Sequence, residues 1–506
     1  MMIFPHIVSR IRWLRFRCSG LRVKPSGGGI LLLMALAFFC SFCQGRNRLH
    51  LDEEALREEL AAIPVASSAE GTVDTSRPKV PRQPIDRSVD ASAPPVLIDL
   101  PSVEEASEMP GLSDVAHEVV YIKLQSGAML LTDSMATLSF TMSGSSLICS
   151  NGVEVASFSM EGRFIERLAS LGSEAVPPVP AEMFGSMAKD VRNARFINQL
   201  EVTGSGLYAH VYDGPTNRMR LYEIPPLQGE PAIQQIRTQE SAALPVENMR
   251  RAGTVFPRGR LYMLDSKHLL ATRRGGSLDD EMASVVSIDG DTIGYANYSE
   301  KIGNWTHSVI RGGESGASVR TPEGLVLHRP PYSDTVFEVH PPAKMVPRYI
   351  LTLSGRGVSR NEGMSPGFDL KDRLLHGDLC DAGGFLFIKY TQNYDCPNTR
   401  NAKTLSMFRV VYNKQTRKAL RLPASRSDYG FGLPDDLNGG LPVWPMSNFM
   451  SGRNLVTPVS LSELKQHLAS RAFQVSSAPA ARKEAFTQFV ASLRDEDIIV
   501  RVVRFK

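Results

Sequence analysis

Short apolar runs recur along the chain from His117 onward, and each run ends at Gly, Asp, Asn, Ser or Pro. Examples are EVVYIKLQSG, SFTMSG, GLYAHVYDG, VVSIDGD and FLFIKYT. Runs rich in Val, Ile, Phe and Tyr that are separated by closely spaced turn residues are typical of antiparallel strands. Helical periodicity is confined to a short stretch at 51–63 and to two stretches near the end, 461–470 and 481–493. The pattern therefore predicts an all-β domain with a few terminal helices.

So many strands need an architecture without long exposed edges, and a β-propeller provides it by repeating four-stranded blades around an axis. Residues 153–168, 333–351 and 406–422 each contain a strand, a polar or Pro-containing turn and a returning strand. We interpret them as equivalent parts of different blades. The sequence thus predicts a six-bladed β-propeller over residues 111–506, in preference to seven or eight blades. A pair of packed sheets or an irregular barrel is the alternative.

Closure of such a ring requires that the last strand pairs within it. The chain ends on an apolar run, 497–505, which we expect to be that strand. Ile498, Val500 and Val502 share one face, and Arg501 lies on the other, so the second face is expected to be partly solvated.

The N-terminal 45 residues have the features of an export signal. Fourteen apolar residues, 30–43, are too few to span a membrane as a helix, which needs about 20. The six basic residues of the segment precede this run: Arg10, Arg12, Arg15, Arg17, Arg22 and Lys24. We therefore predict a signal peptide, or an uncleaved anchor, and export to the cell envelope.

Cysteines at the end of an apolar signal are the acylation sites of bacterial lipoproteins. Cys40 and Cys43 are the candidates, and Cys43 is favoured because polar residues follow it. The alternative is that both are ordinary apolar residues of the signal. Residues 46–110 follow as a short helix and a segment rich in Pro, Ser and Ala, which we expect to be a flexible tether.

The charge balance argues against nucleic acid as a partner. The chain has a net charge of +4, but all six basic residues of the first 45 lie in a segment without acidic residues, so the remainder carries −2. No cluster of Lys and Arg stands out in the expected propeller.

Four phrases of the expected propeller resemble a family of exported, often lipid-anchored six-bladed β-propeller proteins of Gram-negative bacteria, related to NHL-repeat propellers. They are the stretches 115–127, 157–172, 333–357 and 435–446. In the third phrase, Asp334, Thr335, Pro347 and Tyr349 match the family pattern. The resemblance implies the fold and the envelope location. The chain departs from the family at Asp435, where Asn is usual, at Asn438, where Asp is usual, and in a Gly-rich turn that is replaced here.

The loop DDLNGGLPVWPM carries the strongest candidate chemistry. Asp435, Asp436 and Asn438 could offer oxygen ligands to a cation or another ligand. We favour the alternative, in which these side chains satisfy the backbone of a tight turn and the two glycines adopt positive φ. No histidine pair has zinc-binding spacing, and His328 and His340 lie in separate strands. We predict no metal and no cofactor.

Trp305, in the loop GNWTHS, is the remaining candidate ligand-binding residue, unless it packs between blades. No Ser-His-Asp or phosphate-loop pattern is present. The sequence therefore favours a non-enzymatic binding or scaffold module that recognises a ligand or protein partner at the propeller mouth and is held to the membrane by its N-terminus. The alternative is a hydrolase or lyase that uses acidic residues at the central channel.

Overall fold

The computed structural model describes residues 81–125, 138–171, 195–213, 218–224, 250–251, 261–272, 281–288, 290–300, 316–365, 368–394, 404–426 and 431–506. The chain divides into two units, and all of these residues belong to one of them. The other unit, Met1–Ala69 with Ala181–Lys189, lies outside the described residues, and so do Cys40, Cys43 and the predicted helix 51–63.

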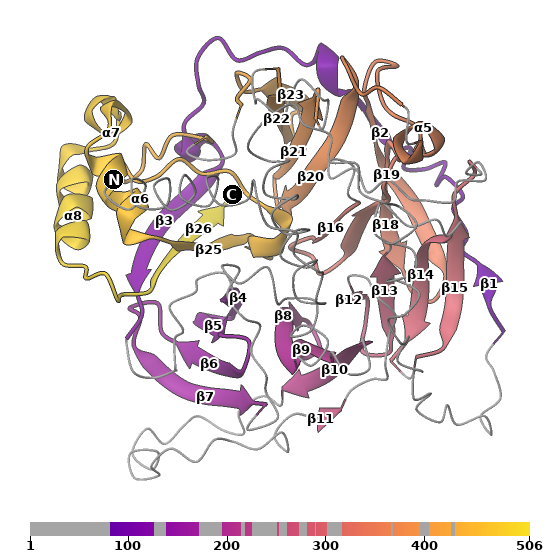
Figure 1. Cartoon of the computed structure of the whole chain (residues 1–506), viewed down its shortest axis with the longest axis horizontal. Helices are drawn as coiled ribbons and strands as arrows, with labels where there is room; N and C mark the ends of the chain where they lie inside the picture. The colour runs from indigo at the N-terminus through magenta and orange to yellow at the C-terminus, as the bar shows by residue number, and fades with distance from the viewer. Residues whose placement is uncertain are drawn as a thin grey trace, which may run out of the picture. The chain divides into compact units, whose positions relative to one another are not determined.

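The described strands form six sheets arranged in a ring, as Figure 1 shows. Blade 1 consists of β4 to β7, which span Ser139–Ser143, Ser146–Ser150, Glu154–Phe158 and Phe164–Ser170. Blade 2 consists of β8 to β11, which span Arg195–Thr203, Gly206–Asp213, Arg218–Ile224 and Arg250–Arg251. Blade 3 contains β12 to β15, which span Leu261–Met263, His268–Thr272, Glu281–Ser287 and Thr292–Asn297.

The remaining blades continue the same order. Blade 4 contains β16 to β19, which span Ala317–Arg320, Val326–Arg329, Thr335–His340 and Lys344–Thr352. Blade 5 consists of β20 to β23, which span Leu374–Ala382, Phe385–Gln392, Ser406–Asn413 and Lys418–Arg421. Blade 6 combines β24 to β26, which span Met450–Ser451, Asn454–Val459 and Ile499–Phe505, with β3, Ala116–Lys123. The prediction of a six-bladed β-propeller is confirmed.

The three segments that the sequence suggested to be equivalent do occupy equivalent positions. They contain the third and fourth strands of their blades, which are β6 and β7, β18 and β19, and β22 and β23. A hydrophobic cluster fills each of the six seams between neighbouring blades. Because both faces of a blade pack against neighbours, most of its strands are buried on both sides.

The ring is closed by pairing the two distant parts of the chain within blade 6. β26 pairs antiparallel with β25 on one side and with β3 on the other. The cluster between blades 6 and 1 unites Ile122 of β3, Val500 of β26 and Phe140 of β4. The predicted closing strand is therefore present.

The prediction that the Arg501 face of this strand is partly solvated is wrong. Arg501 is only 8% exposed. Its guanidinium donates from Nη1 to the carbonyls of Leu441 and Pro442, at 3.3 and 3.1 Å, and from Nε to Thr457 Oγ1 at 3.3 Å. The loop before β24 covers this face, so that carbonyl groups replace water around the charge.

The chain before β3 runs around the outer rim of blades 3 to 6. β1, Gln83–Pro84, adds to β15 of blade 3, and β2, Val96–Asp99, adds to β19 of blade 4, both in parallel. Glu105 then bridges to Arg421 of blade 5. We call residues 81–115 the rim segment. The sequence placed the start of the propeller at residue 111, but β1 and β2 join blade sheets before it.

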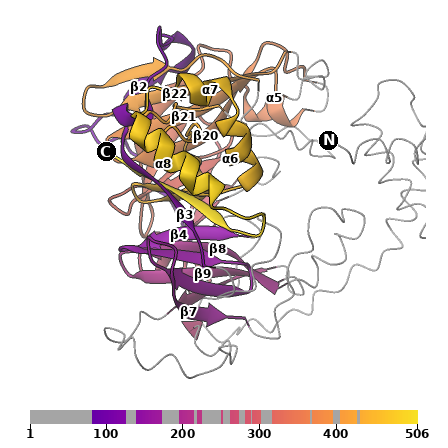
Figure 2. The same ribbon diagram turned by 90° about the vertical axis from the view of Figure 1, so that its left-hand side faces the viewer.

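The predicted terminal helices are confirmed and lie between β25 and β26. α6, Leu461–Leu468, and α8, Ala480–Ala491, flank the short α7, Arg471–Val475. Figures 1 and 2 show the three helices at the periphery beside β3 and β25. They bury Leu464, Phe486 and Val490 against Val459 and Ile499. The other described helix is α5, Arg360–Met364, and short 3₁₀ turns η1, η2 and η9 span Leu100–Ser102, Leu112–Asp114 and Ser447–Phe449.

The two faces of the propeller differ in their connections. The first and second strands of each blade are joined by two to five residues. The connections between blades, and those between second and third strands, open on the opposite face and include α5 to α8. We call this the long-loop face. Since binding residues are concentrated on loops held by a rigid scaffold, this face is where a site is expected.

Candidate functional site

A buried ion-pair network joins the innermost strands of blades 2, 3 and 4. Glu201 of β8 accepts hydrogen bonds from His210 Nε2 at 3.0 Å and from the backbone N–H of Met263 of β12 at 3.1 and 3.2 Å. Arg320 of β16 donates to the same carboxylate and to the carbonyl of Met263. Burial would raise the pKa of Glu201, but the bond from His210 and the charge of Arg320 outweigh it, so the pKa is lowered.

Both carboxylate oxygens of Glu201 are thus engaged by protein donors, and the side chain is only 7% exposed. Removing one partner would leave the other buried and uncompensated, so truncation of Glu201 or Arg320 would destabilise the contact between blades. Among the described residues, no group of three or more His, Cys, Asp or Glu side chains is placed to hold a metal ion.

The two histidines considered from the sequence make separate contacts. His328 of β17 is fully buried, and its Nδ1 lies 2.8 Å from Ser318 Oγ. Burial lowers the pKa of His328 to about 3, and the adjacent Arg329 adds to the effect. His340 instead pairs with Glu338 at 2.6 Å.

The loop of Asp435, Asp436, Asn438 and the two glycines lies over the closing blade. Asp435 is 2% exposed, and its two oxygens accept the backbone N–H groups of Leu437, Asn438 and Gly440 at 3.1, 2.9 and 3.0 Å. Burial raises the pKa of Asp435, although these three donors and the charge of Arg501 favour its ionised form.

The same loop fastens the N-terminal strand. Asp436 accepts from Ser113 N at 2.8 Å and from Ser113 Oγ at 2.5 Å, and Asn438 Nδ2 donates to the carbonyl of Val119 of β3 at 2.6 Å. The Tyr121 hydroxyl of β3 accepts the N–H of Leu441 at 3.0 Å. We call residues 435–440 the clasp. Its side chains bond to backbone groups, as the turn interpretation of this loop predicts. Of its two glycines only Gly439, at φ +75°, has positive φ, so that part of the prediction is wrong for Gly440.

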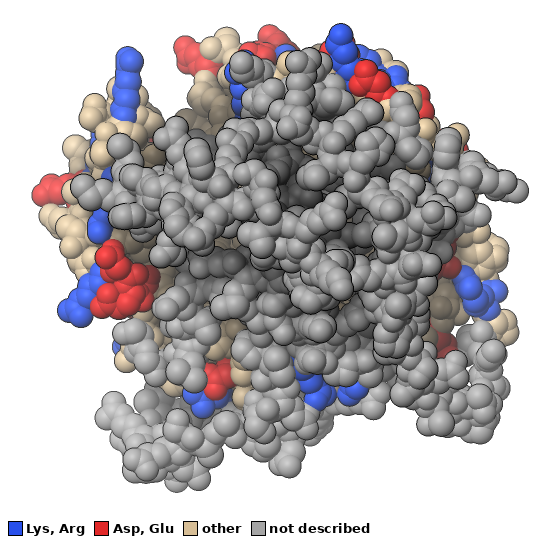
Figure 3. All heavy atoms as spheres, viewed as in Figure 1, with Lys and Arg blue, Asp and Glu red and all other residues tan. Residues whose placement is uncertain are grey.

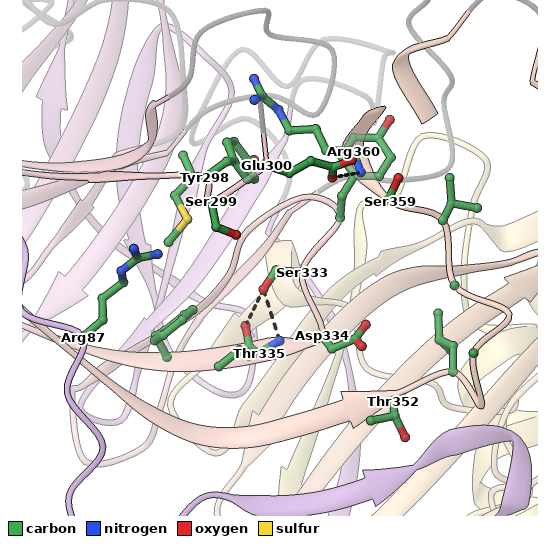
Figure 4. A pocket seen from close by; sticks show the side chains of 17 residues that line it. Arg87, Tyr298, Ser299, Glu300, Ser333, Asp334, Thr335, Thr352, Ser359 and Arg360 are labelled. Atoms are coloured by element: carbon green, nitrogen blue, oxygen red, sulfur yellow. Dashed lines mark hydrogen bonds between the residues drawn. The ribbon is translucent and has the colours of Figure 1, made fainter. Parts of the chain in front are cut away.

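A pocket of about 590 Å³ opens on the long-loop face at the seam between blades 3 and 4. Its walls come from the end of β15, the connection between β17 and β18, the segment from β19 to α5, and the rim segment. The lining residues are Arg87, Met282, Tyr298, Ser299, Glu300, Tyr332, Ser333, Asp334, Thr335, Phe337, Thr352, Leu353, Gly355, Gly357, Val358, Ser359 and Arg360. We call it the seam pocket (Figure 4).

Two of its four charged residues, Glu300 and Arg360, make contacts within the wall of the pocket. Glu300 accepts the backbone N–H groups of Arg360 and Asn361, at 2.9 and 3.1 Å, at the start of α5. The Arg360 guanidinium lies over the Tyr298 ring, 4.1 Å from its centre, and the residue is 2% exposed. These contacts fix α5 against the end of β15.

The other two face the opening. The Asp334 side chain is 50% exposed, and its Oδ1 lies 2.9 Å from Nε2 of the buried His376 of β20. Arg87 is exposed and donates from Nη1 to the carbonyl of Asn297 at 3.2 Å. In the seam pocket, charged groups of both signs therefore face a hollow.

Sequence reasoning did not assign the seam pocket. Asp334 and Thr335 belong to the phrase that carried the family resemblance, which was the one signal that pointed to this loop. Arg87 lay in a segment expected to be a tether. Trp305 lies outside the described residues; Glu300, the last described residue before it, lines the pocket.

The family of the chain follows from its sequence. A family model described as "Domain of unknown function (DUF4933)" matches residues 78–470, which begin just before β1. The chain belongs to this family. The matched residues include the rim segment, blades 1 to 5 and the first part of blade 6. β26, the third strand of blade 6 along the chain order β24 to β26, follows the end of the match.

Several solved structures are similar to this DUF4933 chain at low identity. A Bacteroides fragilis protein described as exported is 14% identical with a TM-score of 0.48, covering 81% of this chain and 100% of its own. A member of the DUF4221 family from Bacteroides vulgatus is 11% identical with a TM-score of 0.34, covering 78% and 97%. Virginiamycin B lyase from Staphylococcus aureus is 10% identical with a TM-score of 0.26, covering 60% and 88%. The sequence matches none of the curated proteins with which it was compared.

The surface of the long-loop face has mixed charge where it is described. Figure 3 shows Lys and Arg side chains interspersed with Asp and Glu around the rim of the propeller. None of the described helices has the length and apolar character needed to cross a bilayer.

Proposed function

We propose that this DUF4933 propeller is a non-enzymatic binding or scaffold module of the cell envelope, and that its ligand binds in the seam pocket. The observation that carries the proposal is the Asp334 carboxylate, which has one oxygen held by His376 and faces the hollow. The hollow has the volume of a small-molecule or peptide site, and both polar and apolar side chains line it.

The difference between Asp334, which faces the seam pocket, and Glu201, which is enclosed by protein groups, favours binding over hydrolase or lyase chemistry. Catalysis at the central channel would need acidic groups that can reach a substrate, whereas Glu201, on the innermost strand of blade 2, is buried and bound by three donors. The alternative enzyme function would be favoured if a bound compound were converted to a product.

The location is proposed from the N-terminal sequence. The basic and apolar segment before residue 44 would direct export, and acylation of Cys43, or of Cys40, would hold the propeller at the membrane. Labelling with a palmitate analogue tests this. Equal labelling of the natural protein and a Cys40→Ser/Cys43→Ser variant would eliminate acylation at both sites.

The binding proposal is tested with the full-length protein in detergent. Thermal-shift screening against envelope glycan fragments and short peptides, with and without EDTA, identifies ligands, and calorimetry measures their affinity. An Asp334→Asn variant should weaken binding about tenfold or more. The matched control, Asp495→Asn, changes a side chain that is 94% exposed and should bind normally. Equal affinity of the natural and Asp334→Asn proteins for every ligand would overturn the proposal.

Trp305→Phe provides a second variant for the same screen, because the sequence marks Trp305 as a candidate ligand-binding residue. Weaker binding by this variant would extend the site to the loop after Glu300.

A further inference from the structure

The seam pocket presents one cation and one carboxylate to solvent, and they are not paired with each other. Within the described residues, Arg87 has the carbonyl of Asn297 as its partner, and Asp334 has His376. Figure 4 shows Arg87 at one side of the pocket, with Ser333 and Thr335 between it and Asp334. Opposite charges that line one hollow without pairing are available to a ligand that carries both signs.

Both groups are held in place by the backbone around them. The N–H of Ile85 bonds the carbonyl of Tyr295 of blade 3 at 2.8 Å, and Asp86 exchanges bonds with Ala343 and Met345 of blade 4 at 2.9 and 2.8 Å. These bonds fix the chain immediately before Arg87. On the other side, the carbonyl of Asp334 accepts the N–H of Leu351 at 2.7 Å. A site whose charged groups are held in this way loses less entropy on binding.

Apolar side chains also line the pocket. Met282, Phe337, Leu353 and Val358 line the pocket and are at most 8% exposed. The remaining charges, Glu300 and Arg360, are engaged within the wall, as described above. The lining therefore has no net excess of either charge, which disfavours a purely anionic or purely cationic ligand.

We propose that the seam pocket binds a short peptide with free termini, whose carboxylate pairs with Arg87 and whose ammonium group pairs with the free oxygen of Asp334. This inference rests on the proposed function. A guanidinium can bind a carboxylate through two parallel hydrogen bonds, and a carboxylate is the complement of an ammonium group. Apolar side chains of the peptide would contact the apolar residues of the lining. Because both charges are solvent-exposed, the affinity is modest.

The test uses the full-length protein and the tripeptide Ala-Leu-Ala in four forms: free, N-acetylated, C-amidated, and blocked at both ends. Calorimetry or ligand-observed NMR gives the dissociation constants. Blocking either end should weaken binding about tenfold. An Arg87→Gln variant should bind the free and C-amidated peptides equally, and an Asp334→Asn variant should bind the free and N-acetylated peptides equally. A variant that had merely lost structure would bind all four peptides weakly and would not become insensitive to one particular terminus.

Two control variants remove the same charges elsewhere. Arg482→Gln on α8 and Asp495→Asn after it change exposed residues and should preserve the preference for free termini. Equal binding of the free and doubly blocked peptides would overturn the inference, and so would no binding at about 10 mM. If a neutral disaccharide binds and Asp334→Asn weakens it, the pocket is a glycan site, and the proposed function stands without the peptide. If no ligand responds to either pocket variant, both proposals fail.

Discussion

The clasp and the seam pocket are built from the same kinds of residues but differ in what their polar groups contact. In the clasp, Asp435 is 2% exposed and binds three backbone N–H groups. In the pocket, the side chain of Asp334 is 50% exposed and has one partner, His376. Both residues lie in loops on the long-loop face. An aspartate in a polar loop is thus either part of the fold or part of a site, and its hydrogen-bond partners distinguish the two.

This difference predicts that substitutions in the clasp affect stability, whereas substitutions in the seam pocket affect ligand binding. Changes in the clasp should lower the free energy of unfolding, because buried donors lose their acceptor. Changes at Asp334 and Arg87 should leave stability nearly unchanged and affect ligands. Five predictions test this separation, beginning with the closing strand that the clasp covers.

Deletion of residues 496–506 is expected to have the largest effect. It removes β26 from the middle of blade 6 and separates β25 from β3. It also opens three hydrophobic clusters at once. The loss should exceed the total stability of about 5–15 kcal/mol that a domain typically has. We expect aggregation or loss of the near-ultraviolet circular dichroism spectrum, whereas an unchanged melting curve would show that the ring closes elsewhere.

The blades and terminal helices could be predicted because their signals are local. Apolar runs and turn residues predicted the strands, and the 3.6-residue period predicted α6 and α8. β1 and β2 gave no such signal, because they are two and four residues long and are joined to their blades at an edge through backbone hydrogen bonds. The environment of Arg501 was missed for a different reason: the loop at 441–442 that covers it is distant in sequence.

The seam pocket could not be predicted because no single segment contains it. Its lining comes from residues 87 and 282 and from three segments between 298 and 360 that only the packing of blades 3 and 4 brings together. The clasp residues, in contrast, were recognised because they are adjacent in sequence. Their composition alone left a turn and a ligand site as alternatives.

Gly440→Ala should be the most damaging point substitution in the clasp. A Cβ atom there would lie 2.3 Å from the Tyr121 hydroxyl and 2.7 Å from Asp435 Oδ2, both of which are held by hydrogen bonds. We expect a loss of about 3 kcal/mol in denaturant unfolding. Gly439→Ala, at φ +75°, should cost about 1 kcal/mol. Gly204→Ala is the control, because no atom lies within 4 Å of its added Cβ. A similar stability for Gly440→Ala and this control would contradict the packing described.

Asp435→Ala should destabilise the protein by about 2–3 kcal/mol, because it leaves one buried and two partly buried N–H groups without an acceptor. Asp436→Ala should cost about 1 kcal/mol, since it loses only the bonds to Ser113. Calcium should change neither value. If calcium raises the melting temperature of the natural protein and the Asp435→Ala/Asp436→Ala variant loses this response, the clasp is a metal site.

Stability should decrease as the pH falls from 6.5 towards 3, because His328 is buried in its neutral form. Its pKa is lowered in the folded state, so the unfolded chain binds protons more readily in this range and gains stability relative to the fold. The expected loss between pH 7 and pH 5 is on the order of 2 kcal/mol. A His328→Asn variant should show a weaker pH dependence, measured by urea unfolding. His117→Asn, at an exposed position of β3, should retain it, and an equal slope in all three proteins would refute the assignment.

Asp334→Asn should have the smallest effect on stability, about 0.5 kcal/mol or less, because its carboxylate is half exposed and the pair with His376 is near solvent. Measured by the same urea unfolding as Asp435→Ala, this value tests the comparison directly, since both variants remove one aspartate from a long-loop connection. A loss as large as that of Asp435→Ala would mean that Asp334 stabilises the seam between blades 4 and 5 through His376, and the reason to assign it to a binding site would disappear. A small loss in the free energy of unfolding together with weaker ligand binding would show that Asp334 serves binding, whereas Asp435 of the clasp serves stability.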